Sequence, residues 1–157
     1  MKLIAGRHGE AEAAPNDFER HLTEKGRKDI EGLAQIVLNT HWSFKEIRCS
    51  PVLRAVQTAQ ILADNLGGLN LVRDERLAPG FEIEDIFELL NSYKPSDSCI
   101  WIFHAPDIQR VVSRLVGVPD SALYFPPGTM AAMNLPLPAL EGRSMLVWKM
   151  QPELISG

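Results

Sequence analysis

The chain has 157 residues, 45% of them hydrophobic and 23% charged, which is the composition of an ordinary globular protein. A chain of this length can bury a sizeable core, and we expect one domain over residues 1–157. The net charge of -4 argues against nucleic acid or an anionic membrane as the main partner, because either would favour a basic face.

The cellular context is indicated by what the sequence lacks. The apolar stretch at the N-terminus is too short for a signal peptide, and no apolar run approaches the ~20 residues needed to span a bilayer. We therefore expect a cytoplasmic protein. Cys49 and Cys99 each lie beside a predicted strand and have no C-x-x-C spacing, which favours buried free thiols over a disulfide or a metal pair.

Strand and helix patterns alternate along the chain, and this alternation predicts a three-layer α/β/α fold with a mostly parallel sheet. Strands are predicted over 2–6, 45–49, 69–73, 98–103, 129–135 and 144–150. Helices are predicted from residue 23 to about 38, from 51 to 66, over 82–92 and over 106–116. The apolar segment 98–103 is expected at the sheet centre, and the last two strands are expected to form an antiparallel hairpin at one edge.

Two helix starts carry clear capping signals. Thr23 is a good N-cap for the first helix. Ser50 is predicted to cap the second helix, with Pro51 at the first helical position, where its missing N–H costs nothing. Gly117 is expected to end the fourth helix.

Four chemically capable side chains fall at the carboxyl ends of predicted strands, where ligands bind in open α/β sheets. Arg7 and His8 follow the first strand, Arg54 lies in the first turn after the second strand, and His104 follows the central strand. Arginine matches phosphate oxygens, and a neutral imidazole is a competent nucleophile toward phosphorus. Nearby arginines should lower the pKa of a histidine and keep it unprotonated. Together these residues predict a phosphate-handling site, in which Gly9 lets the backbone approach the ligand.

Each of these residues also has a structural interpretation when taken alone. His104 alone is more often a buried core histidine, and Arg54 alone is more often a solvated helix residue. We assign no function to His21 or His41. A metal site is disfavoured because no H-x-H or H-E-x-x-H spacing occurs and the arginines would repel a cation, so neither a metal nor another cofactor is expected.

Four ordered segments resemble the histidine phosphatase superfamily, which has the phosphoglycerate-mutase-like fold, and in particular its SixA-type phosphohistidine phosphatases. The segments are R-H-G-E-A at 7–11, R-H-L-T-E-K-G at 20–26, S-P-V-L-R-A-V-Q-T-A at 50–59 and F-H-A-P-D at 103–107. The resemblance covers nearly the whole chain. Phe103 stands where glycine is common in the family, and Ala105 stands where a polar residue is frequent; both can reshape the pocket wall.

The resemblance implies a role for each matched residue. His8 would be the nucleophile that becomes transiently phosphorylated. Arg7, Arg54 and Arg20 would hold phosphate oxygens, and His104 would donate a hydrogen bond to the phosphoryl group.

The proton donor that many ester-cleaving relatives carry has no clear match. Glu82 is one candidate, although it also reads as a carboxylate at a helix start. Asp17 is the other, because it matches an aspartate upstream of the R-x-L-T segment; it also reads as a solvated loop acid. A general acid typically contributes 10²–10⁴-fold when a basic alkoxide leaves, whereas an imidazole needs less help. A weak donor site therefore favours cleavage of a P–N bond.

The favoured prediction is thus a phosphatase that removes phosphate from phosphohistidine on a partner protein. Two alternatives share the fold: a phosphatase of a small phosphorylated metabolite or nucleotide, and a non-catalytic phosphate- or phosphoprotein-binding module. An unrelated α/β domain remains possible only if His8 and His104 lie at opposite ends of the sheet.

Overall fold

Six strands form one mixed sheet in the order β3-β2-β4-β1-β5-β6 in a computed structural model, which describes residues 1–155. The strands are β1 (Lys2–Arg7), β2 (Glu46–Cys49), β3 (Leu71–Arg73), β4 (Ser98–Phe103), β5 (Met130–Asn134) and β6 (Met145–Met150). The helices are α1 (Glu24–Leu38), α2 (Leu53–Asn65), α3 (Ile83–Asn91) and α4 (Asp107–Val116). Short 3₁₀ turns are η1 (Asp17–Glu19), η2 (Glu75–Leu77), η3 (Asp120–Ala122) and η4 (Pro152–Leu154). None of these helices is both long and apolar enough to cross a membrane.

The strand directions confirm the predicted fold class. β4 pairs in parallel with β1 and β2, and β2 pairs in parallel with β3. β5 runs antiparallel to β1, and β6 runs antiparallel to β5, so the predicted hairpin forms one edge of the sheet. Because β1, β2 and β4 are parallel, their carboxyl ends meet at one side of the molecule.

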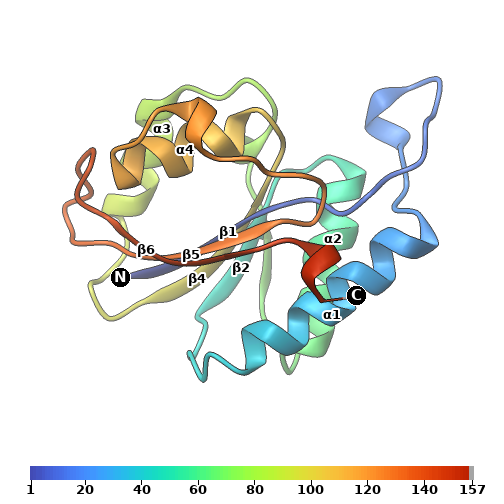
Figure 1. Ribbon diagram of the computed structural model, residues 1–157, viewed down its shortest axis with the longest axis horizontal. Helices are drawn as coiled ribbons and strands as arrows, with labels where there is room; N and C mark the ends of the chain where they lie inside the picture. Colours follow the sequence, from blue (N-terminus) through green and yellow to red (C-terminus); the bar gives the residue numbers. More distant parts are fainter. Residues whose placement is uncertain (156–157) are drawn as a thin grey trace.

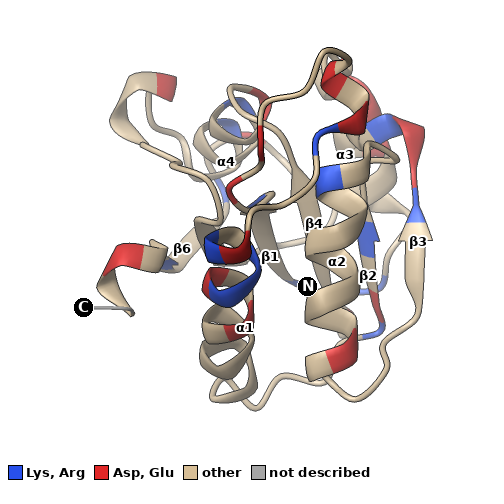
Figure 2. Cartoon of the chain, turned by 90° about the vertical axis from the view of Figure 1, so that its right-hand side faces the viewer, with Lys and Arg blue, Asp and Glu red and all other residues tan. Residues whose placement is uncertain are grey.

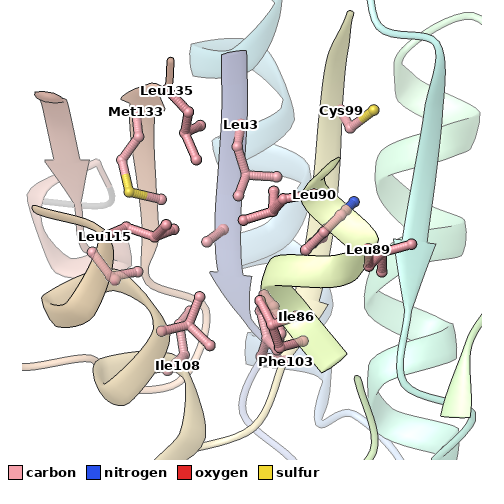
Figure 3. Close-up of a cluster of buried hydrophobic side chains, with 14 of the residues drawn as sticks. Leu3, Ile86, Leu89, Leu90, Cys99, Phe103, Ile108, Leu115, Met133 and Leu135 are labelled. Carbon is pink, nitrogen blue, oxygen red and sulfur yellow. The ribbon is translucent and has the colours of Figure 1, made fainter. Parts of the chain in front are cut away.

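Helices cover both faces of the sheet and create two apolar cores. Figure 1 shows α3 and α4 on one face and α1 and α2 on the other. Alternate residues of the strands face opposite cores, as the pleat requires: in β4, Trp101 packs toward α3 and α4, while Ile100 and Ile102 pack toward α1 and α2. Figure 3 shows side chains from α3, α4 and the strands meeting in the first core. β4 is buried along its whole length, as expected for the sheet centre.

The cysteines occupy these two cores separately. Cys99 lies in the core beneath α3 and α4, and Cys49 lies in the core beneath α1 and α2. Both are buried free thiols, which confirms the prediction, and burial raises the pKa of each to about 12.

The start of α2 differs from the prediction. Thr23 does cap α1, since its hydroxyl accepts a hydrogen bond from the N–H of Gly26. Ser50 does not cap α2: the helix begins at Leu53, and its N-cap residue, Val52, makes no side-chain capping bond. Instead, the Ser50 hydroxyl accepts from the N–H of Val52, one residue before the helix begins, and lies 2.8 Å from a ring nitrogen of His104.

Gly26 fixes how α1 approaches the loop that follows β1. A Cβ at this position would overlap the backbone carbonyl oxygen of Glu10, so only glycine fits without a shift. Gly32, in the same helix, has no such neighbour: a Cβ there would come 3.4 Å from the side chain of Ile155. Packing therefore requires glycine at position 26, whereas at position 32 only the low helix propensity of glycine is at issue.

We predict that Gly26→Ala lowers the free energy of unfolding by about 1–3 kcal/mol, the usual cost of overpacking. Gly32→Ala, the matched control, should leave it unchanged or raise it by up to about 1 kcal/mol, because alanine is the better helix former. Urea unfolding of both variants measures the difference. Equal effects of the two substitutions would contradict the packing requirement at Gly26.

Candidate active site

The two histidines predicted to share a site do lie together, at the carboxyl ends of adjacent strands. His8 follows β1 and His104 follows β4, and their ring centroids are 5.1 Å apart. Both are buried, at 5% and 3% exposure. This proximity excludes the interpretation in which the histidines lie at opposite ends of the sheet. Figure 2 shows this side of the molecule, where cationic and anionic residues are mixed rather than forming a uniformly basic face.

The ring of His8 has one nitrogen held by the backbone and one directed at Arg54. Its Nδ1 lies 2.8 Å from the carbonyl oxygen of Gly9, and since a carbonyl can only accept, Nδ1 carries the proton. Its Nε2 then has a free lone pair, which accepts a hydrogen bond from Arg54 Nε at 3.2 Å. Desolvation lowers the pKa of His8 to about 3, and the cations around it act in the same direction. His8 is therefore a neutral imidazole at physiological pH.

His104 is also held neutral. Burial, followed by the charge of Arg54, lowers its pKa to about 4. Its Nε2 pairs with the Ser50 hydroxyl, whereas its Nδ1 is buried and has no hydrogen-bond partner among residues 1–155. A buried polar atom without a partner is costly and often marks a ligand-binding position.

Arg7 and Arg54 approach the histidines from different elements. Arg7, the last residue of β1, donates from Nη1 to the carbonyl oxygen of Phe125 at 2.8 Å, and its Nε is buried without a partner in the described part of the chain. Arg54, in the first turn of α2, is 6% exposed and lies beside His8. Desolvation lowers the pKa of Arg7, which shows that its charge is held in a poorly solvated position.

Asp17 links Arg54 to Arg20. Arg54 donates to the Asp17 backbone carbonyl at 2.7 Å and to its carboxylate at 3.1 Å, and Arg20 donates to the other carboxylate oxygen at 3.3 Å. Arg20 also donates from Nε to the carbonyl oxygen of Glu12. Desolvation raises the pKa of Asp17, but the hydrogen bonds from Arg20 and Arg54 and the charges of these two arginines together outweigh it and hold the pKa below its ordinary value. The carboxyl group is therefore ionised at neutral pH and carries no proton to donate.

Glu82, the second candidate donor, lies outside this cluster. It is the exposed N-cap residue of α3. Across the described residues it makes no side-chain hydrogen bond or salt bridge with either histidine.

Two residues of the site were not recognised as functional in the sequence. The sequence pattern of Ser50 indicates only a helix cap. Thr58 follows Arg54 by one helical turn, and its hydroxyl accepts from the Gly9 N–H at 3.0 Å while donating to the Arg54 carbonyl at 2.8 Å. The i, i+4 spacing of Arg54 and Thr58, which places both on one helix face, was the signal available for Thr58.

Gly9 is required by packing as well as by the site. A Cβ there would lie 3.1 Å from the Ile30 side chain and 3.2 Å from the Gly26 carbonyl oxygen. A side chain at this position would therefore press against α1, while the Gly9 carbonyl and N–H contact His8 and Thr58.

A groove adjoins the site on the Arg54 side. Its walls include Phe18 from η1, Val52 and Val56 at the start of α2, Arg73 at the end of β3 and Glu75 in η2. Phe18 directly follows Asp17 and is 63% exposed. The cluster of His8, His104 and Arg54 thus lies next to a largely apolar surface depression.

Comparisons with known proteins agree with this geometry. The sequence model of the histidine phosphatase superfamily (branch 1) matches residues 3–79. A search of curated protein sequences gives no match.

Solved structures match over nearly the full length of both chains. The protein histidine phosphatase SixA complexed with tungstate has a TM-score of 0.87 at 24% identity, with 98% of this chain and 99% of that chain covered. A protein assigned as phosphohistidine phosphatase SixA, from Agrobacterium tumefaciens, has a TM-score of 0.81 at 23% identity, covering 96% and 97%. A protein assigned as an alpha-ribazole-5'-P phosphatase, from Escherichia coli, has a TM-score of 0.77 at 17% identity, covering 97% and 98%.

At these identities the structural matches establish the fold. The family match assigns residues 3–79, which span β1, α1, α2 and β3, to the histidine phosphatase superfamily (branch 1), and the solved structures show that the fold they share with this chain extends over nearly its whole length.

Proposed function

We propose that the chain is a phosphatase that transfers a phosphoryl group to His8 and then to water, and that its substrate is phosphohistidine on a partner protein. The observation that carries the proposal is the contact between the unprotonated Nε2 of His8 and the buried guanidinium of Arg54. The nucleophilic nitrogen and the guanidinium are thus in contact. The nitrogen can attack a phosphoryl group there while the guanidinium stabilises the negative charge of that group. Neither a metal nor an organic cofactor is part of the proposal.

In the first step, the Nε2 lone pair of His8 forms a bond to phosphorus as the P–N bond of the substrate breaks. The electron pair of that bond stays with the substrate imidazole, which leaves neutral if it entered protonated. Arg7, Arg54 and Arg20 are proposed to hold the phosphoryl oxygens, with His104 as a further hydrogen-bond donor. The Gly9 carbonyl, which accepts from Nδ1 of His8, stabilises the positive charge that the ring gains when Nε2 is phosphorylated.

In the second step, water attacks phosphorus and the bond to His8 Nε2 breaks. Phosphate leaves and the neutral imidazole is restored. SixA complexed with tungstate, an oxyanion, is the solved structure that supports oxyanion binding on this fold.

The ionised state of Asp17 supports cleavage of a P–N bond over a P–O bond. An alkoxide leaving group needs a proton, and a general acid typically contributes 10²–10⁴-fold. Asp17 is already ionised and is paired with Arg54 and Arg20. An imidazole leaving group brings its own proton, so it does not depend on such an acid.

The groove beside the site supports a protein substrate. Phosphohistidine on a folded protein presents neighbouring side chains to the enzyme, and the exposed Phe18 and the apolar groove wall offer a surface for them. The competing candidate is a small phosphate ester, favoured by the fold shared with the protein assigned as an alpha-ribazole-5'-P phosphatase.

We predict that His8→Ala abolishes turnover and the formation of a phosphoenzyme, because no other unprotonated ring nitrogen contacts Arg54 in the described residues. His41→Ala is the matched control, since His41 is exposed and lies in a loop; it should retain full activity. Phosphate release and alkaline-stable labelling with radioactive phosphate measure both properties. Full activity in His8→Ala would refute the mechanism.

The substrate class is tested by comparing a histidine-containing peptide phosphorylated by phosphoramidate with a panel of sugar phosphates, nucleotides and phosphoserine. We expect kcat/KM to be at least about 100-fold higher for the phosphohistidine peptide, within the contribution of a missing general acid. Faster turnover of any ester would instead support the small-molecule phosphatase. Phosphate binding without turnover of any substrate would support the non-catalytic module.

A further inference from the structure

Ser50 is fully buried directly after β2, and its hydroxyl contacts two groups. The Oγ atom accepts a hydrogen bond from the backbone N–H of Val52 at 3.2 Å. The same atom lies 2.8 Å from Nε2 of His104. Neither contact is explained by helix capping, because α2 begins later, at Leu53.

The proton of the hydroxyl has one acceptor available. A serine hydroxyl carries one hydrogen and two lone pairs, and one lone pair is engaged by the Val52 N–H. Among residues 1–155, the Nε2 of His104 is the acceptor within hydrogen-bonding distance of Ser50 Oγ. If Nε2 carried a proton, the Ser50 hydrogen would be buried without a partner, which is a costly arrangement. The hydroxyl therefore donates to Nε2, and Nε2 is unprotonated.

The tautomer of His104 follows from this bond. Burial keeps the His104 ring neutral, and a neutral imidazole carries one proton on one of its two nitrogens. Because Nε2 is unprotonated, that proton is on Nδ1. Nδ1 is the buried ring atom that has no partner in the described structure. His104 thus presents an N–H donor, whereas the neighbouring His8 presents a lone pair at Nε2.

We propose that Ser50 is a positioning residue that holds His104 in the Nδ1–H tautomer, so that this ring donates to the transferring phosphoryl group. The effect on turnover rests on the proposed phosphatase function, but the tautomer itself does not.

Ser50 lies in a segment whose polar side chains contact the site at a regular spacing. Ser50, Arg54 and Thr58 recur at intervals of four residues, and they contact His104, His8 and Gly9 respectively. This segment therefore supplies a hydrogen-bond partner to one ring nitrogen of each histidine.

The test is ¹⁵N NMR of the imidazole nitrogens, in which protonated and unprotonated nitrogens resonate far apart. The protein has four histidines, and His104→Gln identifies the signals of this ring by their loss. In the unsubstituted protein near neutral pH, we expect a protonated Nδ1 and an unprotonated Nε2 for His104. Ser50→Ala should convert this ring to a mixture of tautomers or to the Nε2–H form.

Ser113→Ala is the matched control, because Ser113 is also buried but bonds to the Arg110 carbonyl and to Asp120, away from the histidines. It should leave the His104 signals unchanged. With the phosphorylated histidine peptide, kcat should fall about 10- to 100-fold in Ser50→Ala, by analogy with the loss of a hydrogen-bond partner that orients a metal-binding histidine. It should be unchanged in Ser113→Ala.

A protonated Nε2 in the unsubstituted protein, or an unchanged tautomer in folded Ser50→Ala, would overturn the proposal. If the unsubstituted protein turns over no phosphohistidine peptide, the phosphatase function fails, while the NMR result still decides the role of Ser50.

Discussion

The hydrogen bond between Nδ1 of His8 and the carbonyl oxygen of Gly9 is the interaction on which the site depends. It fixes the proton on one ring nitrogen and leaves the other free to face Arg54. The bond requires Gly9 to be held firmly, and two contacts do so: the Thr58 hydroxyl accepts from its N–H, and α1 packs directly against its Cα. The nucleophile is therefore set by backbone packing, not by a partner carboxylate.

The positive charge of the buried Arg54 is balanced by Asp17, which lies in a different part of the chain. Arg54 is buried, and an isolated buried cation is costly. Asp17 offsets part of that cost through its carboxylate and its backbone carbonyl, and Arg20 joins the same carboxylate. Under the proposed function, an arriving phosphate would compete with Asp17 for these arginines. In that exchange one anion would replace another, and the guanidinium groups would stay paired.

The alternation of strands and helices was sufficient to predict the sheet, its antiparallel edge and the position of β4, because β4 is buried on both faces and reads as a continuous apolar run. It also predicted that His8, Arg54 and His104 meet, since residues after parallel strands share one side of the sheet. Element ends were harder to predict. The third strand begins at Leu71 instead of residue 69, because the N–H groups of Gly68 and Leu69 bond to the Ala63 carbonyl and complete the end of α2.

Individual hydrogen bonds between side chains distant in sequence could not be predicted from local sequence patterns. Ser50 matches a helix-cap pattern, and only the position of β4 reveals that its hydroxyl meets His104. Asp17 lies in a loop without periodicity, so its pairing with Arg54 depends on how that loop folds over α2. Such pairings are decided by tertiary packing, which a local pattern does not encode.

The position of the phosphate on His8 tests the central claim most directly. The enzyme is mixed with the phosphorylated histidine peptide and quenched in alkali, in which phosphohistidine survives, and the phosphorylated atom is identified by ³¹P NMR and mass spectrometry of the digest. With Nδ1 held by Gly9, we expect the phosphoryl group on Nε2 of His8. Phosphate on Nδ1, or on a residue other than His8, would contradict the account.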